Sequence, residues 1–173
     1  KMLENSYYAK LYNKLIGGKT FSNIVLNPNM IGAAGVIFSG LNINLAFGGS
    51  DLINVSNFQH EFYHLFQIQH NNMDATEMKR VKGCMEFERY LFEDICKLNE
   101  LNGNWDDTDY DWACWRNKTN GYGTIGNRDG YMNWLMGITN NGTSYPTDIS
   151  QSDFNQWAGI FPTVNPAYTP EYG

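Results

Sequence analysis

Two histidines and a glutamate stand at positions 60, 64 and 61 of the chain, in the run His-Glu-Phe-Tyr-His. On a helix, residues i and i+4 project from one face, so His60 and His64 could hold one Zn²⁺ ion with both imidazoles. Glu61 would lean toward the open position of the metal, where a carboxylate can take a proton from a water molecule. The spacing therefore predicts a zinc site with His60 and His64 as ligands and Glu61 as general base.

The residues around this motif carry the helical periodicity that such a site needs. From Leu52 to Phe66 the apolar residues keep the three- and four-residue spacing of a helix face, and the motif has uncharged flanks. Ser50 or Asp51 is the expected N-terminal cap. We therefore expect a buried helix over residues 51–70.

The segments before and after this helix predict an α+β fold. A helix is expected over residues 5–16, and the apolar pattern over residues 35–47 is typical of a half-exposed strand, or of two strands. Residues 75–101 predict a long second helix that starts at a capping box and stops at an Asn-Gly pair. The rest is rich in Gly, Asn and Asp and is expected to be a loop-rich lobe, with short helices at 130–137 and 150–160.

The motif resembles the H-E-x-x-H signature of the zincin metallopeptidases, over roughly residues 36–98. The resemblance implies a minimal catalytic domain whose small antiparallel or mixed sheet, with residues 41–47 as edge strand, packs on the motif helix (51–70) and a long second helix (75–101). In that superfamily the edge strand pairs with an extended substrate, so residues 41–47 are expected to bind a peptide. We expect one domain over residues 1–173, trimmed at its N-terminus because the chain begins with Lys1.

The third metal ligand separates the zincin subtypes. In the gluzincin arrangement a glutamate of the next helix completes the site. The segment from Met85 to Phe92 is similar to the E-x-x-A-(D/N)-x-F run of the CAAX-prenyl-protease-like and ImmA-like families. This similarity implies Glu86 as the third ligand, although Arg89 and Tyr90 replace the small residue and the Asp or Asn of that run.

The helical periodicity of the same segment favours Glu88 instead. Glu88 interrupts an otherwise apolar stripe, where a lone carboxylate needs a compensating charge such as a metal ion, whereas Glu86 lies on the side expected to face solvent. His70 is a further possibility, because it matches the last histidine of the Met-turn motif H-E-x-x-H-x-x-G-x-x-H, although Gln67 stands where that motif has glycine. We prefer Glu86 and keep Glu88 as the alternative.

Other polar residues could assist such a site. Tyr122, Arg128 and Tyr131 are candidate donors to the oxyanion of a tetrahedral intermediate. Asp94 could orient a ligand histidine, although its position beside Lys97 favours an ordinary surface carboxylate. The three cysteines lack metal-type spacing and are expected to be buried thiols.

Composition limits the classes of partner. The 173 residues carry a net charge of −6 and only 12 Lys and Arg, which argues against a nucleic-acid partner. The longest apolar stretch, residues 31–45, is interrupted by Gly and Asn, so no membrane span is expected. Abundant Asn, Gly, Tyr and Trp with few basic residues suggests an extracytoplasmic bacterial protein, that is, a secreted or periplasmic protein or a surface lipoprotein.

Together these features predict a zinc-dependent metallopeptidase that acts on a peptide or protein substrate. Glu61 would be its catalytic base, and His60, His64 and Glu86 would hold the Zn²⁺. An alternative from another class is a non-catalytic or degenerate zincin-like binding module, whose Trp- and Tyr-rich lobe over residues 105–134 would bind glycans or a protein partner. Metal-dependent hydrolysis that requires Glu61 would distinguish the two.

Overall fold

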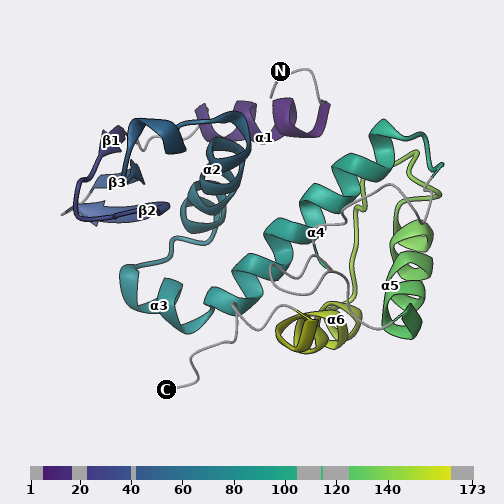
Figure 1. The fold of residues 1–173 in the computed structure, drawn as a ribbon. Helices are drawn as coiled ribbons and strands as arrows, with labels where there is room; N and C mark the ends of the chain where they lie inside the picture. Colours follow the sequence, from purple (N-terminus) through teal and green to yellow (C-terminus); the bar gives the residue numbers. More distant parts are fainter. Residues whose placement is uncertain (1–5, 17–22, 40–41, 105–113, 115–124, 165–173) are drawn as a thin grey trace. The chain divides into compact units, whose positions relative to one another are not determined.

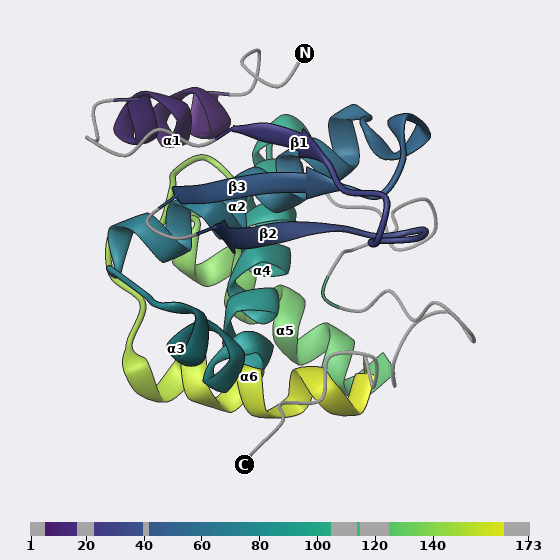
Figure 2. The same cartoon turned by 90° about the vertical axis from the view of Figure 1, so that its left-hand side faces the viewer.

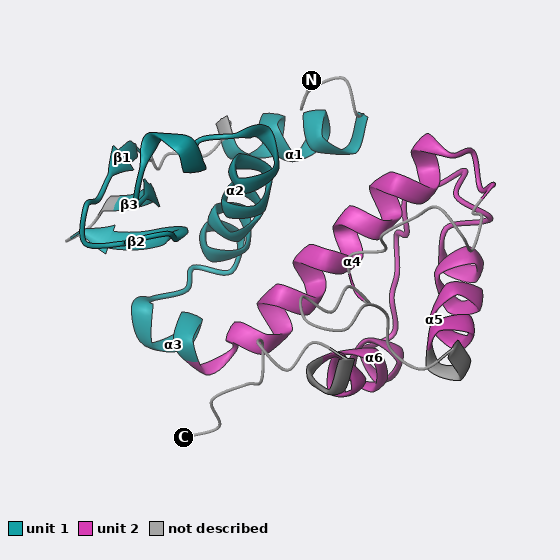
Figure 3. Ribbon diagram, viewed as in Figure 1, with its two compact units in different colours: residues 1–79 teal, residues 80–173 magenta. Residues whose placement is uncertain are grey.

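The computed structural model describes residues 6–16, 23–39, 42–104, 114 and 125–164. These residues form a mixed α/β fold with six α-helices and one three-stranded sheet (Figure 1). The chain divides into two compact units, residues 1–79 and residues 80–173 (Figure 3), and the prediction of one domain over residues 1–173 stays a prediction. In the ranges described, no helix combines the length and the hydrophobicity of a membrane span.

The first unit contains the sheet, in the strand order β1-β3-β2 (Figure 2). β1 (Ile24–Leu26) runs parallel to β3 (Asn42–Phe47), and β2 (Ala34–Ser39) runs antiparallel to β3. The strand predicted at the edge, residues 41–47, is therefore the central strand, and that prediction was wrong. The reason is β1: a strand of three residues has no alternating pattern that would reveal it in the sequence, yet it covers the second side of β3.

One helix packs onto this sheet, and a second helix packs onto the first. α2 (Val55–His70) packs against β2 and β3, and α1 (Ser6–Ile16), which was predicted over residues 5–16, packs against α2. Their contact includes the rings of Tyr12 and Phe62, whose centroids lie 6.0 Å apart. The helix with the histidine motif is therefore held from the sheet side and from the α1 side.

α2 begins four residues later than the sequence predicted. Residues Ser50–Leu52 form a separate 3₁₀ turn, η2, and the N-cap of α2 is Asn54, whose side-chain oxygen accepts a hydrogen bond from the Asn57 N–H at 2.9 Å. Asn54 has the extended backbone angles that this capping geometry requires. The predicted caps Ser50 and Asp51 were wrong, whereas the predicted helix end at His70 is confirmed.

The predicted long helix over residues 75–101 is two helices, α3 (Ala75–Arg80) and α4 (Lys82–Glu100). The predicted cap is confirmed, because Asp74 Oδ1 accepts hydrogen bonds from the N–H groups of Thr76 and Glu77, both at 2.8 Å. The break falls at Val81, whose φ of −106° and ψ of 12° are not helical. A β-branched residue with a glycine two positions later lowers the cost of such an interruption.

The second unit is helical. α4 packs against α6 (Gln151–Val164), and the ring of Phe87 contacts those of Phe154 and Phe161 at centroid distances of 5.2 and 5.7 Å. α5 (Ile125–Ile138) completes the described part. The lobe predicted as loop-rich thus carries two helices of 14 residues each, both longer than the sequence indicated.

Candidate metal centre

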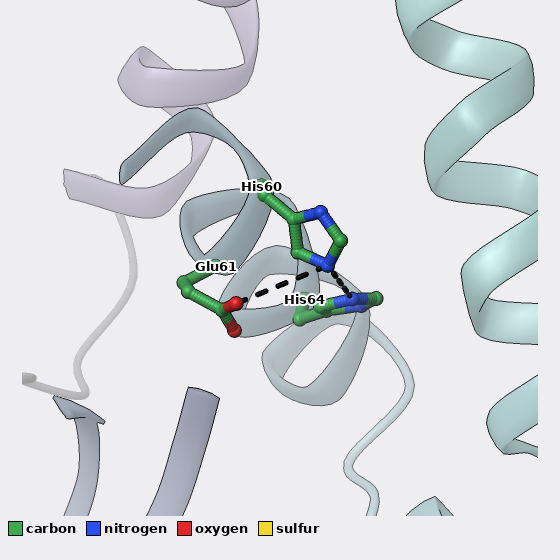
Figure 4. A group of neighbouring side chains, drawn as sticks. All are labelled: His60, Glu61 and His64. Atoms are coloured by element: carbon green, nitrogen blue, oxygen red, sulfur yellow. Dashed lines mark hydrogen bonds and ion pairs between the residues drawn. The ribbon is translucent and has the colours of Figure 1, made fainter. Parts of the chain in front are cut away.

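The sequence motif lies on α2 as predicted, and its three polar side chains converge (Figure 4). The Nε2 atoms of His60 and His64 lie 3.0 Å apart, and Oε1 of Glu61 lies 3.9 Å from Nε2 of His60. One potential ligand atom from each of the three residues lies within 4.8 Å of the other two. The described residues contain this one group of three or more His, Cys, Asp or Glu side chains close enough to share an ion.

The spacing of the two imidazoles suits one zinc ion. Two nitrogens that each lie about 2.1 Å from a tetrahedral zinc are about 3.4 Å apart. The observed 3.0 Å between the Nε2 atoms is a few tenths of an ångström shorter, a difference that small rotations of the two rings would remove. The ring planes are inclined by 70°, so the two nitrogens face each other while the rings do not stack.

Gln67 is a fourth member of the group, and sequence reasoning missed it. Its Oε1 lies 2.8 Å from Nδ1 of His64, and its side chain is 1% exposed. In the sequence, Gln67 stood out only as the residue that replaces a motif glycine. The signal that could have revealed it is the i, i+3 spacing from His64, which places both side chains on one helix face. We call His60, Glu61, His64 and Gln67 the histidine cluster.

The burial of the histidine cluster is graded. His64 and Glu61 are buried, whereas the His60 side chain is 22% exposed. The ring of His60 is therefore the part of the cluster that water can reach. A ligand pair with one protected ring and one accessible ring allows an ion or a small molecule to approach from the His60 side.

Both candidate third ligands lie on α4, in the second unit, and their burial reverses the expectation from periodicity. Glu86 is 7% exposed and Arg89 is 5% exposed, so the face predicted to meet solvent is buried at these two positions. Glu88 is only half-buried. Periodicity did not predict this burial, because α4 has buried residues around most of its circumference. The choice of Glu86 as third ligand, with Glu88 as the alternative, stays a prediction.

His70 does not belong to the histidine cluster. It is the last residue of α2, its side chain is exposed, and its ring stacks on Phe66 at a centroid distance of 5.3 Å. On a continuous helix, six residues rotate a side chain well away from His64. The structure thus places His70 outside the group that could share an ion with His60.

Two of the residues considered as helpers of the site form a separate buried group in the second unit. Oδ2 of Asp94 accepts hydrogen bonds from the Tyr131 hydroxyl at 2.9 Å and from the Cys114 N–H at 3.1 Å. The Tyr131 hydroxyl also lies 3.0 Å from the Cys114 sulfur. We call these three residues the tyrosine cluster. Asp94 is 1% exposed, so its assignment as a surface carboxylate was wrong.

The tyrosine cluster has the electrostatics of an interior network. Burial, followed by the nearby Asp94 carboxylate, raises the pKa of both the Tyr131 hydroxyl and the Cys114 thiol well above their ordinary values. Both groups therefore stay protonated near neutral pH. Of the other cysteines, Cys96 is buried as predicted, whereas Cys84 is exposed and contradicts that prediction.

The described aromatic residues of the second unit include a group of packed rings. Trp134, Trp157 and Tyr131 pack against one another at centroid distances of 5.6–5.8 Å, and Trp157 is buried, as expected of core rings. Trp105, Trp112, Trp115 and Tyr122 lie outside the described residues. Arg128, the remaining candidate oxyanion donor, is buried on α5.

Comparison with protein-family models, with curated proteins and with solved structures gives no match for this chain. The resemblance to the zincins therefore rests on the motif from His60 to His64 and on the segment that contains Glu86.

Proposed function

We propose that the protein is a zinc-dependent hydrolase that cleaves peptide bonds. The observation that carries the proposal is the convergence of two imidazole nitrogens, 3.0 Å apart, beside the carboxylate of Glu61 on one helix. Imidazole nitrogens and one carboxylate are the ligand set of many catalytic zinc sites. His60 and His64 would hold the ion together with Glu86 of α4, which leaves Glu61 for the chemistry.

In this proposal the zinc ion and Glu61 have separate chemical roles. When bound, zinc supplies a Lewis acid that acidifies water and polarises a carbonyl group. Glu61 takes a proton from the attacking water and passes it to the departing amine. Its position next to His60 keeps its carboxylate near the ligand pair, and its burial limits competing contacts with solvent.

An open strand edge in the same unit suits an extended peptide. Among the described residues, no strand pairs with the outer side of β2. The Gly48 N–H donates to the Ala33 carbonyl at 2.9 Å, so Ala33 faces β3. Because successive residues of a strand face opposite ways, Ala34, Val36 and Phe38 direct their backbone N–H and C=O groups outward. We propose that the substrate adds there as a further strand.

Metal content and peptide cleavage test the proposal together. We expect the purified protein to bind about one zinc per chain and to cleave peptides from a mixed library. Glu61→Gln should retain zinc and lose cleavage by about 10²–10⁴-fold, because the general base is gone. Glu77→Gln, the same change at an exposed position on α3, is the matched control. Cleavage that survives Glu61→Gln in the zinc-loaded protein would contradict the mechanism, and a protein that binds no zinc would contradict the site.

A proline at the sheet edge tests the mode of substrate binding. Val36→Pro removes an N–H that points outward, so the β2–β3 ladder should persist while peptide cleavage falls by about fivefold or more. Ile37→Pro removes an N–H that points toward β3 and should lower the free energy of unfolding instead. Unchanged KM and kcat in a folded Val36→Pro protein would show that the substrate binds elsewhere.

A further inference from the structure

We infer that Gln67 is a positioning residue that fixes the tautomer of His64, so that the Nε2 lone pair of His64 is ready for a metal ion. This inference rests on the proposed function, because it concerns how the same site is prepared. The sequence motif does not contain Gln67, and the contact that implicates it lies on the side of the His64 ring away from His60.

The orientation of the Gln67 amide favours one tautomer of His64. Oε1 of Gln67 lies 2.8 Å from Nδ1 of His64, and an amide oxygen can only accept a hydrogen bond. In this orientation the contact favours the tautomer with the proton on Nδ1, which leaves Nε2 of the neutral ring with a lone pair. Gln67 is 1% exposed, so bulk water does not replace the amide as acceptor.

The end of α2 holds the Gln67 backbone. The Gln67 carbonyl accepts hydrogen bonds from the Asn71 N–H at 3.1 Å and from the Asn71 side-chain amide at 2.9 Å. The residue that orients His64 thus lies at the end of α2, where its backbone carbonyl accepts two hydrogen bonds. A fixed backbone restricts the side-chain rotamers that can reach the ring.

The same logic makes the two histidines unequal. Nε2 of His60 and Nε2 of His64 lie 3.0 Å apart, a distance at which one nitrogen can donate a proton to the other. With the His64 proton on Nδ1, as we infer, His60 is the donor of this pair and carries its proton on Nε2. To bind a metal, His60 must release this proton to water and take one at Nδ1, with no net change in charge. Its 22% exposed side chain lets water mediate that exchange.

The tautomers can be read directly in the metal-free protein. The chain has only three histidines, so long-range ¹H–¹⁵N correlation spectra of the rings are simple, and the variants His60→Gln and His70→Gln assign them. At about pH 8.5, where ordinary histidine rings are neutral, we expect the Nδ1–H form for His64 and the Nε2–H form for His60. On addition of zinc, His60 should change tautomer and His64 should not. A wild-type His64 in the Nε2–H form would overturn the inference without any variant.

Variants of Gln67 then test whether the contact sets the tautomer. Gln67→Met keeps the length of the side chain but removes the acceptor, and it should lower zinc affinity by about 10–100-fold while His64 leaves the Nδ1–H form. Gln67→Glu retains an acceptor and should restore both properties. Gln69→Met, the same change two residues along α2, is the matched control and should alter neither. Zinc affinity is measured by competition with a chelator of known strength.

The outcomes separate this inference from the proposed function. Wild-type affinity and an unchanged His64 tautomer in Gln67→Met would overturn the role of Gln67 and leave the zinc site intact. The expected tautomers and zinc affinities in a protein that cleaves no peptide would support the role of Gln67 and contradict only the peptidase proposal.

Discussion

The histidine cluster and the tyrosine cluster are both groups of polar side chains in a largely buried setting, but they differ in how their hydrogen bonds are satisfied. In the tyrosine cluster, the buried Asp94 carboxylate accepts from a hydroxyl and from a backbone N–H. In the histidine cluster, the Nε2 atoms of two rings lie 3.0 Å apart, beside the carboxylate of Glu61. The first arrangement surrounds one carboxylate with donors, whereas the second brings together two ring nitrogens and a carboxylate, all of them atoms that can bind a metal ion.

This difference indicates what each cluster can do. A buried network whose donors and acceptors are matched stabilises the fold and offers little to a ligand. Two imidazole nitrogens and a carboxylate gathered at a partly exposed position are favourable for a cation. The comparison therefore supports the proposal that the histidine cluster binds a metal ion and that the tyrosine cluster is structural, and experiments can test both parts.

The largest expected effect concerns the predicted third ligand. Glu86→Ala should weaken zinc binding by about 10³-fold, which corresponds to about 4 kcal/mol and to the loss of one of three protein ligands. Glu88→Ala, the same change two residues along α4 at a half-buried position, is the matched control and should leave the affinity near that of the wild type. Zinc titrations against a competing chelator measure both.

The reverse result would change the assignment. If Glu88→Ala lost zinc and Glu86→Ala did not, the periodicity of α4 would have identified the ligand and the family resemblance would have misled. Full affinity in both variants would mean that the third ligand is a residue other than these two.

The second effect, of about 3 kcal/mol, belongs to the tyrosine cluster. Asp94→Ala removes the acceptor of the Cys114 N–H and leaves the Tyr131 hydroxyl with only the Cys114 sulfur, a weak acceptor, and a buried donor without a good acceptor costs about 1–3 kcal/mol. The free energy of unfolding, measured with urea, should fall accordingly. Asp94→Asn keeps one acceptor oxygen and should lose less. An Asp94→Ala protein as stable as the wild type but impaired in zinc binding would mean that the tyrosine cluster serves the metal site.

The parts of the molecule that the sequence predicted well are those that depend on neighbours within one helical turn or two. His60 and His64 converge because residues i and i+4 share a helix face, and Asp74 caps α3 through N–H groups two and three residues away. Gln67 belongs to the same class, since its spacing from His64 is local, and a search for partners of the histidines could have found it.

The features that the sequence did not reveal depend on contacts between distant segments. β1 pairs with a strand about twenty residues away, and that pairing places residues 42–47 in the centre of the sheet. Asp94 is buried, and its hydrogen-bond partners Cys114 and Tyr131 are 20 and 37 residues away along the chain. Neither the β1–β3 pairing nor the burial of Asp94 produces a periodic pattern in the neighbouring sequence. The expected edge strand and the expected surface carboxylate were therefore both wrong.

The smallest effect is a pH dependence that the tyrosine cluster should show. In the folded protein, burial and Asp94 raise the pKa of Tyr131 and of Cys114, so both keep their protons at pH values where the unfolded chain loses them. Their contribution to stability is therefore complete below the ordinary pKa values and is lost as the pH rises. Above about pH 9–10, each group should lower the free energy of unfolding by up to about 1.4 kcal/mol per pH unit.

Tyr131→Phe isolates one of these two groups. The variant should be less stable than the wild type at neutral pH, because a hydrogen bond is lost, but its stability should fall less steeply above pH 10, since one titrating group is absent. Tyr145→Phe, the same change at an exposed position of the second unit, is the matched control and should keep the wild-type slope. Urea unfolding between about pH 8 and pH 11 measures the slopes. Equal slopes in Tyr131→Phe and the wild type would mean that the Tyr131 hydroxyl titrates alike in the folded and unfolded chains, and that the tyrosine cluster is more open to water than its burial indicates.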